Sequence, residues 1–204
     1  MELSLLLKGA LIGFSIAAPV GPIGVLCIRR TIAQGRIAGF VSGLGAASAD
    51  AIYGCIAGFG LTFISQFLVK QQNTLSLVGG IFLLYLGIKT FFAKSSGEKL
   101  ENNEKGLWSA YLSTFFLTLT NPITILSFVA IFAGMGIVSE SGDYLSASML
   151  VLGVFTGSML WWGLLSGGAS FFQKKINAGG LVWINKISGL IITVFGVVAL
   201  FRLF

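Results

Sequence analysis

The sequence contains no histidine and only two cysteines, Cys27 and Cys55, among its 204 residues. Histidine, cysteine and clustered carboxylates are the usual protein ligands of transition metals, so neither a metal centre nor metal-ion transport is expected. Both cysteines lie within or at the edge of apolar runs, which argues against a disulfide framework. The composition therefore predicts no metal and no cofactor.

Charged residues are also scarce, at 10% of the chain, whereas hydrophobic residues make up 55%. Soluble domains carry about 25% charged residues, and the mean hydropathy here is +0.94. Apolar runs of about 20 residues are long enough to cross a bilayer as helices and far longer than barrel strands. The sequence therefore predicts an all-α integral membrane protein, whose backbone groups are satisfied within each helix.

Six apolar segments are expected to span the membrane, at residues 3–28, 37–68, 75–92, 107–138, 145–172 and 181–203. Four of them, the first, second, fourth and fifth, exceed the roughly 20 residues that a bilayer needs, so they must tilt, break or protrude. The first is interrupted at residues 19–22 and the fourth at Asn121-Pro122. No basic region precedes the first segment, which we interpret as a retained span rather than a signal peptide.

The two halves of the sequence resemble each other. A shift of 109 residues superposes Gly54 on Gly163, Gly58 on Gly167, Gly80 on Gly189, Gly87 on Gly196 and Phe92 on Phe201, and a shift of 100 superposes Pro22 on Pro122. Residues 1–204 then form a single transmembrane domain, with a first repeat at 1–93, a cytoplasmic linker at 94–106 and a second repeat at 107–204. Because each half has an odd number of spans, the halves must be inverted relative to each other, as in many secondary transporters.

The net charge of +6 comes from lysines and arginines placed at the ends of the apolar segments, where they set topology and touch lipid headgroups rather than nucleic acid. With the N-terminus outside, the cytoplasmic side holds Arg29, Arg30, Arg36, Lys89, Lys94, Lys99, Lys105, Lys174, Lys175 and Lys186, and the outer side holds Lys8, Lys70 and Arg202. The positive-inside rule therefore predicts that both termini lie outside.

Two proline-containing breaks mark a candidate substrate site. Proline is favoured at the first position of a helix, and glycine or asparagine at the cap before it, so Gly21-Pro22 and Asn121-Pro122 each indicate a helix that restarts inside a span. Such a restart presents free N–H groups and a positive helix end, which suit an anion such as an amino-acid carboxylate. An ordinary proline kink is the alternative.

Asp50 is the only acidic residue deep in a predicted span. A central aspartate is costly in a bilayer and is expected to face protein or a water-filled cavity. Gly54 and Gly58, four and eight residues further on, place it on the close-packing face of its helix. It is a candidate proton carrier or a partner for a substrate ammonium group. The structural alternative is an aspartate bonded to a neighbouring helix or paired with Arg29 or Arg30.

A polar stripe in the fourth segment consists of Thr114, Thr118 and Asn121, which lie on one helical face. Thr118 and Asn121 are therefore candidates to line the substrate pathway. Threonines in membrane helices also serve as interhelical hydrogen-bonding groups, which is the alternative for this stripe.

Together these motifs resemble the LysE/RhtB family of amino-acid exporters. The resemblance covers essentially the whole chain and rests on residues 9–13 (GALIG), residues 19–24 (PVGPIG), Arg29-Arg30, Asp50 and Asn121-Pro122. It implies proton-driven amino-acid efflux across the cytoplasmic membrane of a bacterium, with roles for Gly21, Pro22, Asp50, Asn121 and Pro122. Two departures stand out: Val20 separates Pro19 from Gly21, and Ile123 follows Pro122 where the family often has lysine.

The leading interpretation is a secondary transporter that exports amino acids or related small metabolites, with protons and lipid as its other partners and no enzymatic activity. A passive channel or a non-transporting scaffold is one alternative. A membrane thiol–disulfide carrier that uses Cys27 and Cys55 is another, and it requires the two thiols to meet.

Overall fold

The computed structural model describes residues 2–59, 67–93, 104–135, 144–173, 176 and 178–201. Every regular element within these residues is a helix, as the sequence predicts. Residues 67–70 are also helical. The helices are α1 (Glu2–Ala17), α2 (Pro22–Gln34), α3 (Arg36–Gly58), α5 (Gln72–Phe91), α6 (Glu104–Leu119), α7 (Pro122–Met135), α8 (Tyr144–Gln173) and α9 (Ala178–Phe201).

Both predicted helix breaks are present. Gly21 has an extended backbone, with φ −98° and ψ −164°, and α2 begins at Pro22 with an 83° change of direction from α1. The second break turns the chain by 61° between α6 and α7, and α7 begins at Pro122. Proline starts each helix because its missing N–H has no intrahelical acceptor at that position.

Four helices, α3, α5, α8 and α9, are long and apolar enough to cross a membrane, and the number rises to six if each bent pair counts as one span. The protein is therefore a multi-pass membrane protein. The second segment differs from its prediction, because α3 ends at Gly58 rather than at residue 68. Residues 60–66, 94–103 and 136–143, which include most of the predicted linker, lie outside the described part of the chain.

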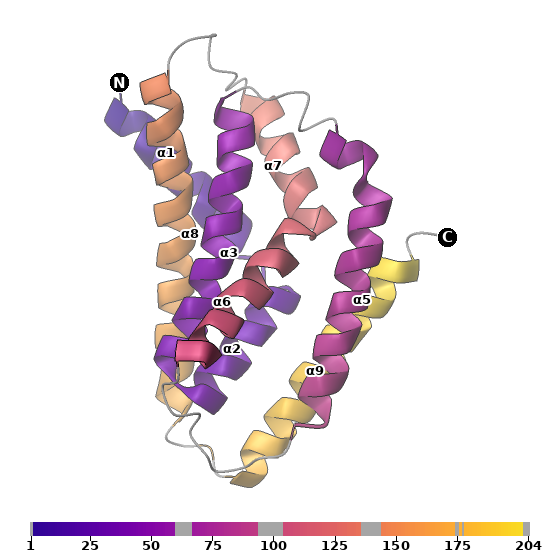
Figure 1. The fold of residues 1–204 in the computed structure, drawn as a ribbon. Helices are drawn as coiled ribbons and strands as arrows, with labels where there is room; N and C mark the ends of the chain where they lie inside the picture. Colours follow the sequence, from indigo (N-terminus) through magenta and orange to yellow (C-terminus); the bar gives the residue numbers. More distant parts are fainter. Residues whose placement is uncertain are drawn as a thin grey trace.

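Most helices form one bundle around α3 and α8, which pack against each other (Figure 1). α1 lies along α8, and α6 lies along α3. The α1–α8 contact is made by glycines: a Cβ atom on Gly13 would strike the backbone of Val154, and one on Gly157 would strike the backbone of Ala10. The close helix approach that small residues spaced four apart indicate is thus present here.

The helices α5 and α9 form a second group at one side of the bundle (Figure 1). Their interface is also lined by glycine, since Gly80 lies against the carbonyl of Gly196 and Gly87 against the carbonyl of Gly189. The pair meets the bundle mainly where α9 packs on α2, while α5 contacts α6 and α7 more sparingly. This arrangement leaves room between α5 and the two helix breaks.

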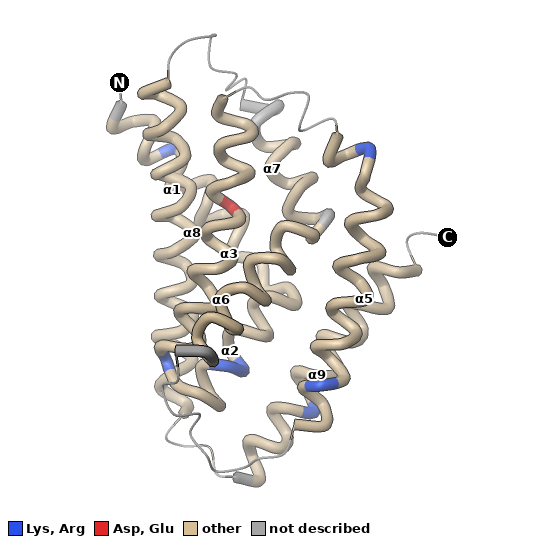
Figure 2. Tube along the Cα trace, in the orientation of Figure 1, with Lys and Arg blue, Asp and Glu red and all other residues tan. Residues whose placement is uncertain are grey.

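Lysine and arginine gather at the end of the bundle where α2 ends and α3 begins, whereas Asp50 lies between the two ends of α3 (Figure 2). Arg29 and Arg30 lie in the second half of α2, Arg36 is the first residue of α3, and Lys89 lies in the last turn of α5. Lys94, Lys99, Lys174, Lys175, Arg202 and the side chain of Lys105 are outside the described residues. The described charges are thus distributed asymmetrically along the helix axes.

Candidate functional site: a pocket at the two helix breaks

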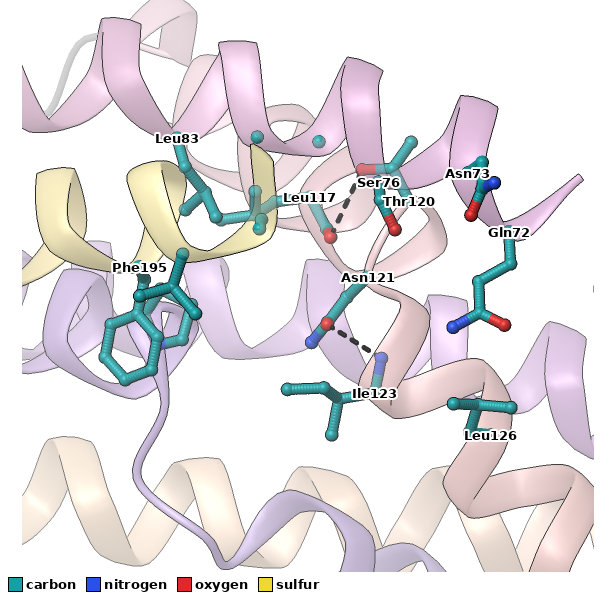
Figure 3. A pocket seen from close by; sticks show the side chains of 15 residues that line it. Gln72, Asn73, Ser76, Leu83, Leu117, Thr120, Asn121, Ile123, Leu126 and Phe195 are labelled. Carbon is teal, nitrogen blue, oxygen red and sulfur yellow. Dashed lines mark hydrogen bonds between the residues drawn. The ribbon is translucent and has the colours of Figure 1, made fainter. Parts of the chain in front are cut away.

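A pocket lies between the α5–α9 pair and the two helix breaks (Figure 3). Its volume is about 150 Å³, which is similar to that of a buried cavity able to take up benzene. The lining residues are Gln72, Asn73, Ser76, Gly79, Gly80 and Leu83 of α5, Leu117, Thr120 and Asn121 at the α6–α7 break, Ile123 and Leu126 of α7, Phe195, Val198 and Ala199 of α9, and Pro22 of α2.

Asn121 lines the pocket and lies immediately before the first residue of α7. Its Oδ1 accepts a hydrogen bond of 3.2 Å from the backbone N–H of Ile123, and its Nδ2 donates one of 3.0 Å to Thr124 Oγ1. This is the capping geometry expected of asparagine before a helix, and it satisfies one of the otherwise unbonded N–H groups of the first turn. The side chain of Asn121 is therefore held at the N-terminus of α7, where it faces the pocket (Figure 3).

Pro22 brings the other helix break to the same pocket. It is the first residue of α2 and lines the cavity together with Asn121. Gly21, just before it, is not a lining residue, and a Cβ atom placed on it would have no atom within 4 Å beyond those of Gly21 and its two chain neighbours. The side chain of Pro122 lies outside the described residues. Of the predicted substrate-site residues, Pro22 and Asn121 are thus the two that the structure places at one cavity.

Thr118 lies elsewhere. It is buried, it does not line the pocket, and its hydroxyl donates a hydrogen bond of 2.8 Å to the carbonyl of Thr114 one turn earlier. Thr114 in turn donates a hydrogen bond of 2.6 Å to the carbonyl of Ser42 on α3. The polar stripe of α6 therefore includes a contact between helices, which is the alternative role of such residues.

Asp50 is buried in the α3–α8 interface, at 3% exposure, and does not line the pocket. Its Oδ2 accepts a hydrogen bond of 2.7 Å from Ser158 Oγ on α8. Trp162 Nε1 donates a hydrogen bond of 3.1 Å to the same Ser158 oxygen. Asp50 thus faces protein rather than lipid, as predicted, and its hydrogen-bond partner is a neutral hydroxyl instead of Arg29 or Arg30.

The two arginines of α2 instead bond to neutral groups. Arg30 is buried and donates to Ser42 Oγ and the Ala110 carbonyl, each at 2.9 Å, and to Ser113 Oγ at 2.7 Å. Arg29 Nε donates to Asn185 Oδ1 of α9 at 2.9 Å. Arg30 therefore connects α2 to α3 and α6 by hydrogen bonds, and Arg29 connects α2 to α9 in the same way.

Several residues of this region were not predicted from the sequence. They include Ser158, which bonds Asp50, and the polar residues of α5 that line the pocket, namely Gln72, Asn73 and Ser76. Ser158 and Trp162 are spaced four apart on the α8 face that carries Gly153 and Gly157 nearby, and this spacing is the one signal in the sequence that could have indicated a polar contact there.

The two cysteines are free and far apart. Cys27 is buried beside Gly39 of α3, and Cys55 lies 16 positions further along that helix, about 24 Å at 1.5 Å per residue. A disulfide requires Cα atoms within about 7 Å. The structure thus argues against the thiol–disulfide carrier considered above.

No group of three or more metal-ligating side chains occurs among the residues that the structure describes.

The sequence model of the LysE type translocator family matches residues 14–202 of this chain. The chain belongs to the LysE type translocator family. This membership confirms the resemblance drawn from the helix-break motifs and makes the protein a member of a family of translocators.

Proteins similar to this chain include two from Bacillus subtilis. One, named YcgF, is assigned by its name to amino acid efflux; it is 29% identical over 203 residues, which cover 95% of this chain and 94% of the relative. The other, the uncharacterized membrane protein YrhP, is 27% identical over 85% of this chain and 87% of its own length. A leucine efflux protein of Salmonella choleraesuis is 27% identical over 58% of this chain and 57% of its own length. No solved structure matches this chain.

Proposed function

We propose that this protein is a secondary transporter that exports amino acids and is driven by inward proton flow. The observation that carries the proposal is the pocket at which both helix breaks meet, with Pro22 and Asn121 in its lining. Membership of the translocator family and the amino acid efflux names of its relatives support the same substrate class.

The substrate carboxylate is proposed to bind at the start of α7. The first N–H groups of a helix lack intrahelical acceptors and form the positive end of the helix dipole, so they attract an anion. Asn121 occupies the cap position and accepts a hydrogen bond from the N–H of Ile123, which also lines the pocket. The carboxylate of an amino acid in this cavity would therefore be attracted chiefly by the positive end of the helix.

The packing of the helices supports the inverted repeat. Exchange of the two halves maps α1 with α2 onto α6 with α7, α3 onto α8, and α5 onto α9. The observed α1–α8 and α3–α6 contacts are then equivalent, and the α3–α8 and α5–α9 contacts map onto themselves. The same exchange converts the Gly80–Gly196 contact into the Gly87–Gly189 contact. We therefore propose a pseudo-two-fold axis through the α3–α8 and α5–α9 interfaces, as in many secondary transporters.

Asp50 is the proposed proton-carrying group. It is the only acidic residue within any predicted span, it is buried, and the partner found for it is the Ser158 hydroxyl. A buried carboxyl group without a cation beside it gains stability by taking up a proton, because the neutral form avoids the cost of desolvating a charge. Such a group can change its charge as the cavity opens to one side or the other.

Transport by the purified protein is the direct test. Proteoliposomes loaded with a mixture of amino acids should release a subset of them when an inward proton gradient is imposed, and a protonophore should abolish this release. Mass spectrometry of the external medium identifies the released species. Release that continues unchanged in the presence of the protonophore would identify a channel, and no release of any amino acid would contradict the proposal.

We further propose that the basic end of the bundle faces the bacterial cytoplasm, with both termini outside. The described lysines and arginines concentrate at that end, as the positive-inside rule requires of cytoplasmic loops. Alkaline phosphatase fused after Phe204 should therefore be active, whereas green fluorescent protein at the same position should not fluoresce. A second pair of fusions within residues 94–103 should give the opposite result. Fluorescence of the fusion at Phe204 would contradict this topology and indicate that the C-terminus lies in the cytoplasm.

A further inference from the structure

The pocket has a polar end and an apolar end. Gln72, Asn73 and Ser76 lie in the first turns of α5, and Leu83 lies about 10 Å further along that helix than Ser76. Leu83, Leu117 and Phe195 gather at the end of the pocket away from Gln72 and Asn73 (Figure 3). A ligand that fits this lining must itself have a polar end and an apolar end.

None of the fifteen residues that line the pocket is charged. An ionised ligand side chain that reached the apolar end would lie beside Leu83 and Leu117, at 7% and 2% exposure, without a counter-ion. An unpaired charge in such surroundings is strongly disfavoured. The lining therefore discriminates against amino acids whose side chains carry a charge.

The pocket is also limited in size. Gly79 and Gly80 line the α5 side and contribute no side chain there, and Phe195 and Leu117 lie at the apolar end. With a volume of about 150 Å³, the cavity accommodates a group of about the size of benzene. An aliphatic side chain of four carbons is smaller than benzene and fits this volume, whereas an indole ring is larger than benzene and exceeds it.

From this lining we infer that the pocket selects uncharged amino acids with aliphatic side chains of the size of valine, leucine, isoleucine and methionine. The inference rests on the proposed function, and it specifies the substrate class of the same site. The α-carboxylate and α-amino groups lie toward Asn121 and the polar residues of α5. The side chain points toward Leu83, Leu117 and Phe195, which act as specificity-determining residues.

The test uses the full-length protein in proteoliposomes that contain equal concentrations of leucine, alanine, tryptophan, lysine and glutamate. With an inward proton gradient, leucine should leave at least about 100-fold faster than lysine or glutamate, because the charged side chains find no partner in the pocket. Release of lysine or glutamate at the rate of leucine would overturn this inference while leaving amino-acid export intact. No gradient-driven release of any of the five would overturn the proposed function and this inference together.

Changes at the apolar end should alter specificity in opposite directions. Phe195→Leu enlarges the pocket and should raise the ratio of tryptophan to leucine release by roughly 10-fold, whereas Leu83→Phe should lower the ratio of leucine to alanine release by a similar factor. Val194→Leu is the matched control, because Val194 lies one position before Phe195 on α9, is 52% exposed and does not line the pocket.

Release ratios from one vesicle preparation are independent of how much protein inserts, so a loss of expression does not imitate a change in specificity. Unchanged ratios in both Phe195→Leu and Leu83→Phe would place the side-chain site elsewhere and overturn the inference. An equal change in Val194→Leu would also overturn it, because that residue lies outside the pocket.

Discussion

Asp50→Asn is expected to abolish proton-driven export, with a fall of roughly 100-fold or more, which is the scale of effect for a group that transfers a proton. Asparagine has nearly the same shape as aspartate, and its carbonyl oxygen can still accept the hydrogen bond that Ser158 donates. The variant should therefore fold and insert like the wild type. It cannot change its charge, however, and so it cannot couple proton movement to transport.

Two measurements separate coupling from structure in this variant. Release of amino acids against their gradient should be lost, while exchange of internal for external amino acid, which requires no net proton movement, should persist. Ser48→Ala is the control: Ser48 lies two residues before Asp50 on α3 and bonds Tyr111 at 2.9 Å instead. Full proton-driven export by Asp50→Asn would leave Asp50 with a structural role in the α3–α8 interface.

Amidation of the substrate is expected to have the second largest effect. If the start of α7 binds the carboxylate, leucinamide should be released far more slowly than leucine, because its neutral amide gains little from the positive helix end and cannot accept charge-assisted hydrogen bonds. The loss should be on the order of 10- to 100-fold, the range of one charge-assisted hydrogen bond. Competition by unlabelled leucinamide against labelled leucine measures this difference directly.

Variants of the helix break provide the matched comparison. Asn121→Ala removes the cap from α7 and should reduce leucine release, and Pro122→Ala should favour a continuous helix and reduce it further. Ser127→Ala is the control, since its hydroxyl bonds the carbonyl of Ile123 within α7 and it does not line the pocket. If unlabelled leucine and leucinamide inhibit the release of labelled leucine equally, the proposed carboxylate site at the start of α7 is contradicted.

The sequence was sufficient for the features that depend on local chemistry. Proline after asparagine or glycine has few structural options, so the starts of α2 and α7 at Pro22 and Pro122 followed from those residues alone. The burial of Asp50 followed similarly, because an acid in an apolar segment must face away from lipid. Glycines four apart are likewise typical of close helix approach, which the structure shows between α1 and α8.

Features that depend on which helices become neighbours were not predicted. Nothing in α5 alone indicates that Ser76 would lie near Asn121, because that proximity results from how the α5–α9 pair docks on the bundle. The same reason applies to Thr118: its helical position can be read from the sequence, but whether its face of α6 meets the pocket depends on how the helices pack. The α2–α9 link between Arg29 and Asn185 also required the tertiary arrangement.

That link has a mechanical consequence. The α5–α9 pair is held together by close contacts at its glycines, and it meets the bundle chiefly where α9 packs on α2. Arg29 and Asn185 fasten this attachment at the basic end, away from Gln72 and Asn73 at the polar end of the pocket. Arg29→Ala should therefore cost about 1.5–3 kcal/mol at this junction, the value of one hydrogen bond from a charged donor. The packing of α9 on α2 would then be the main remaining attachment of the pair.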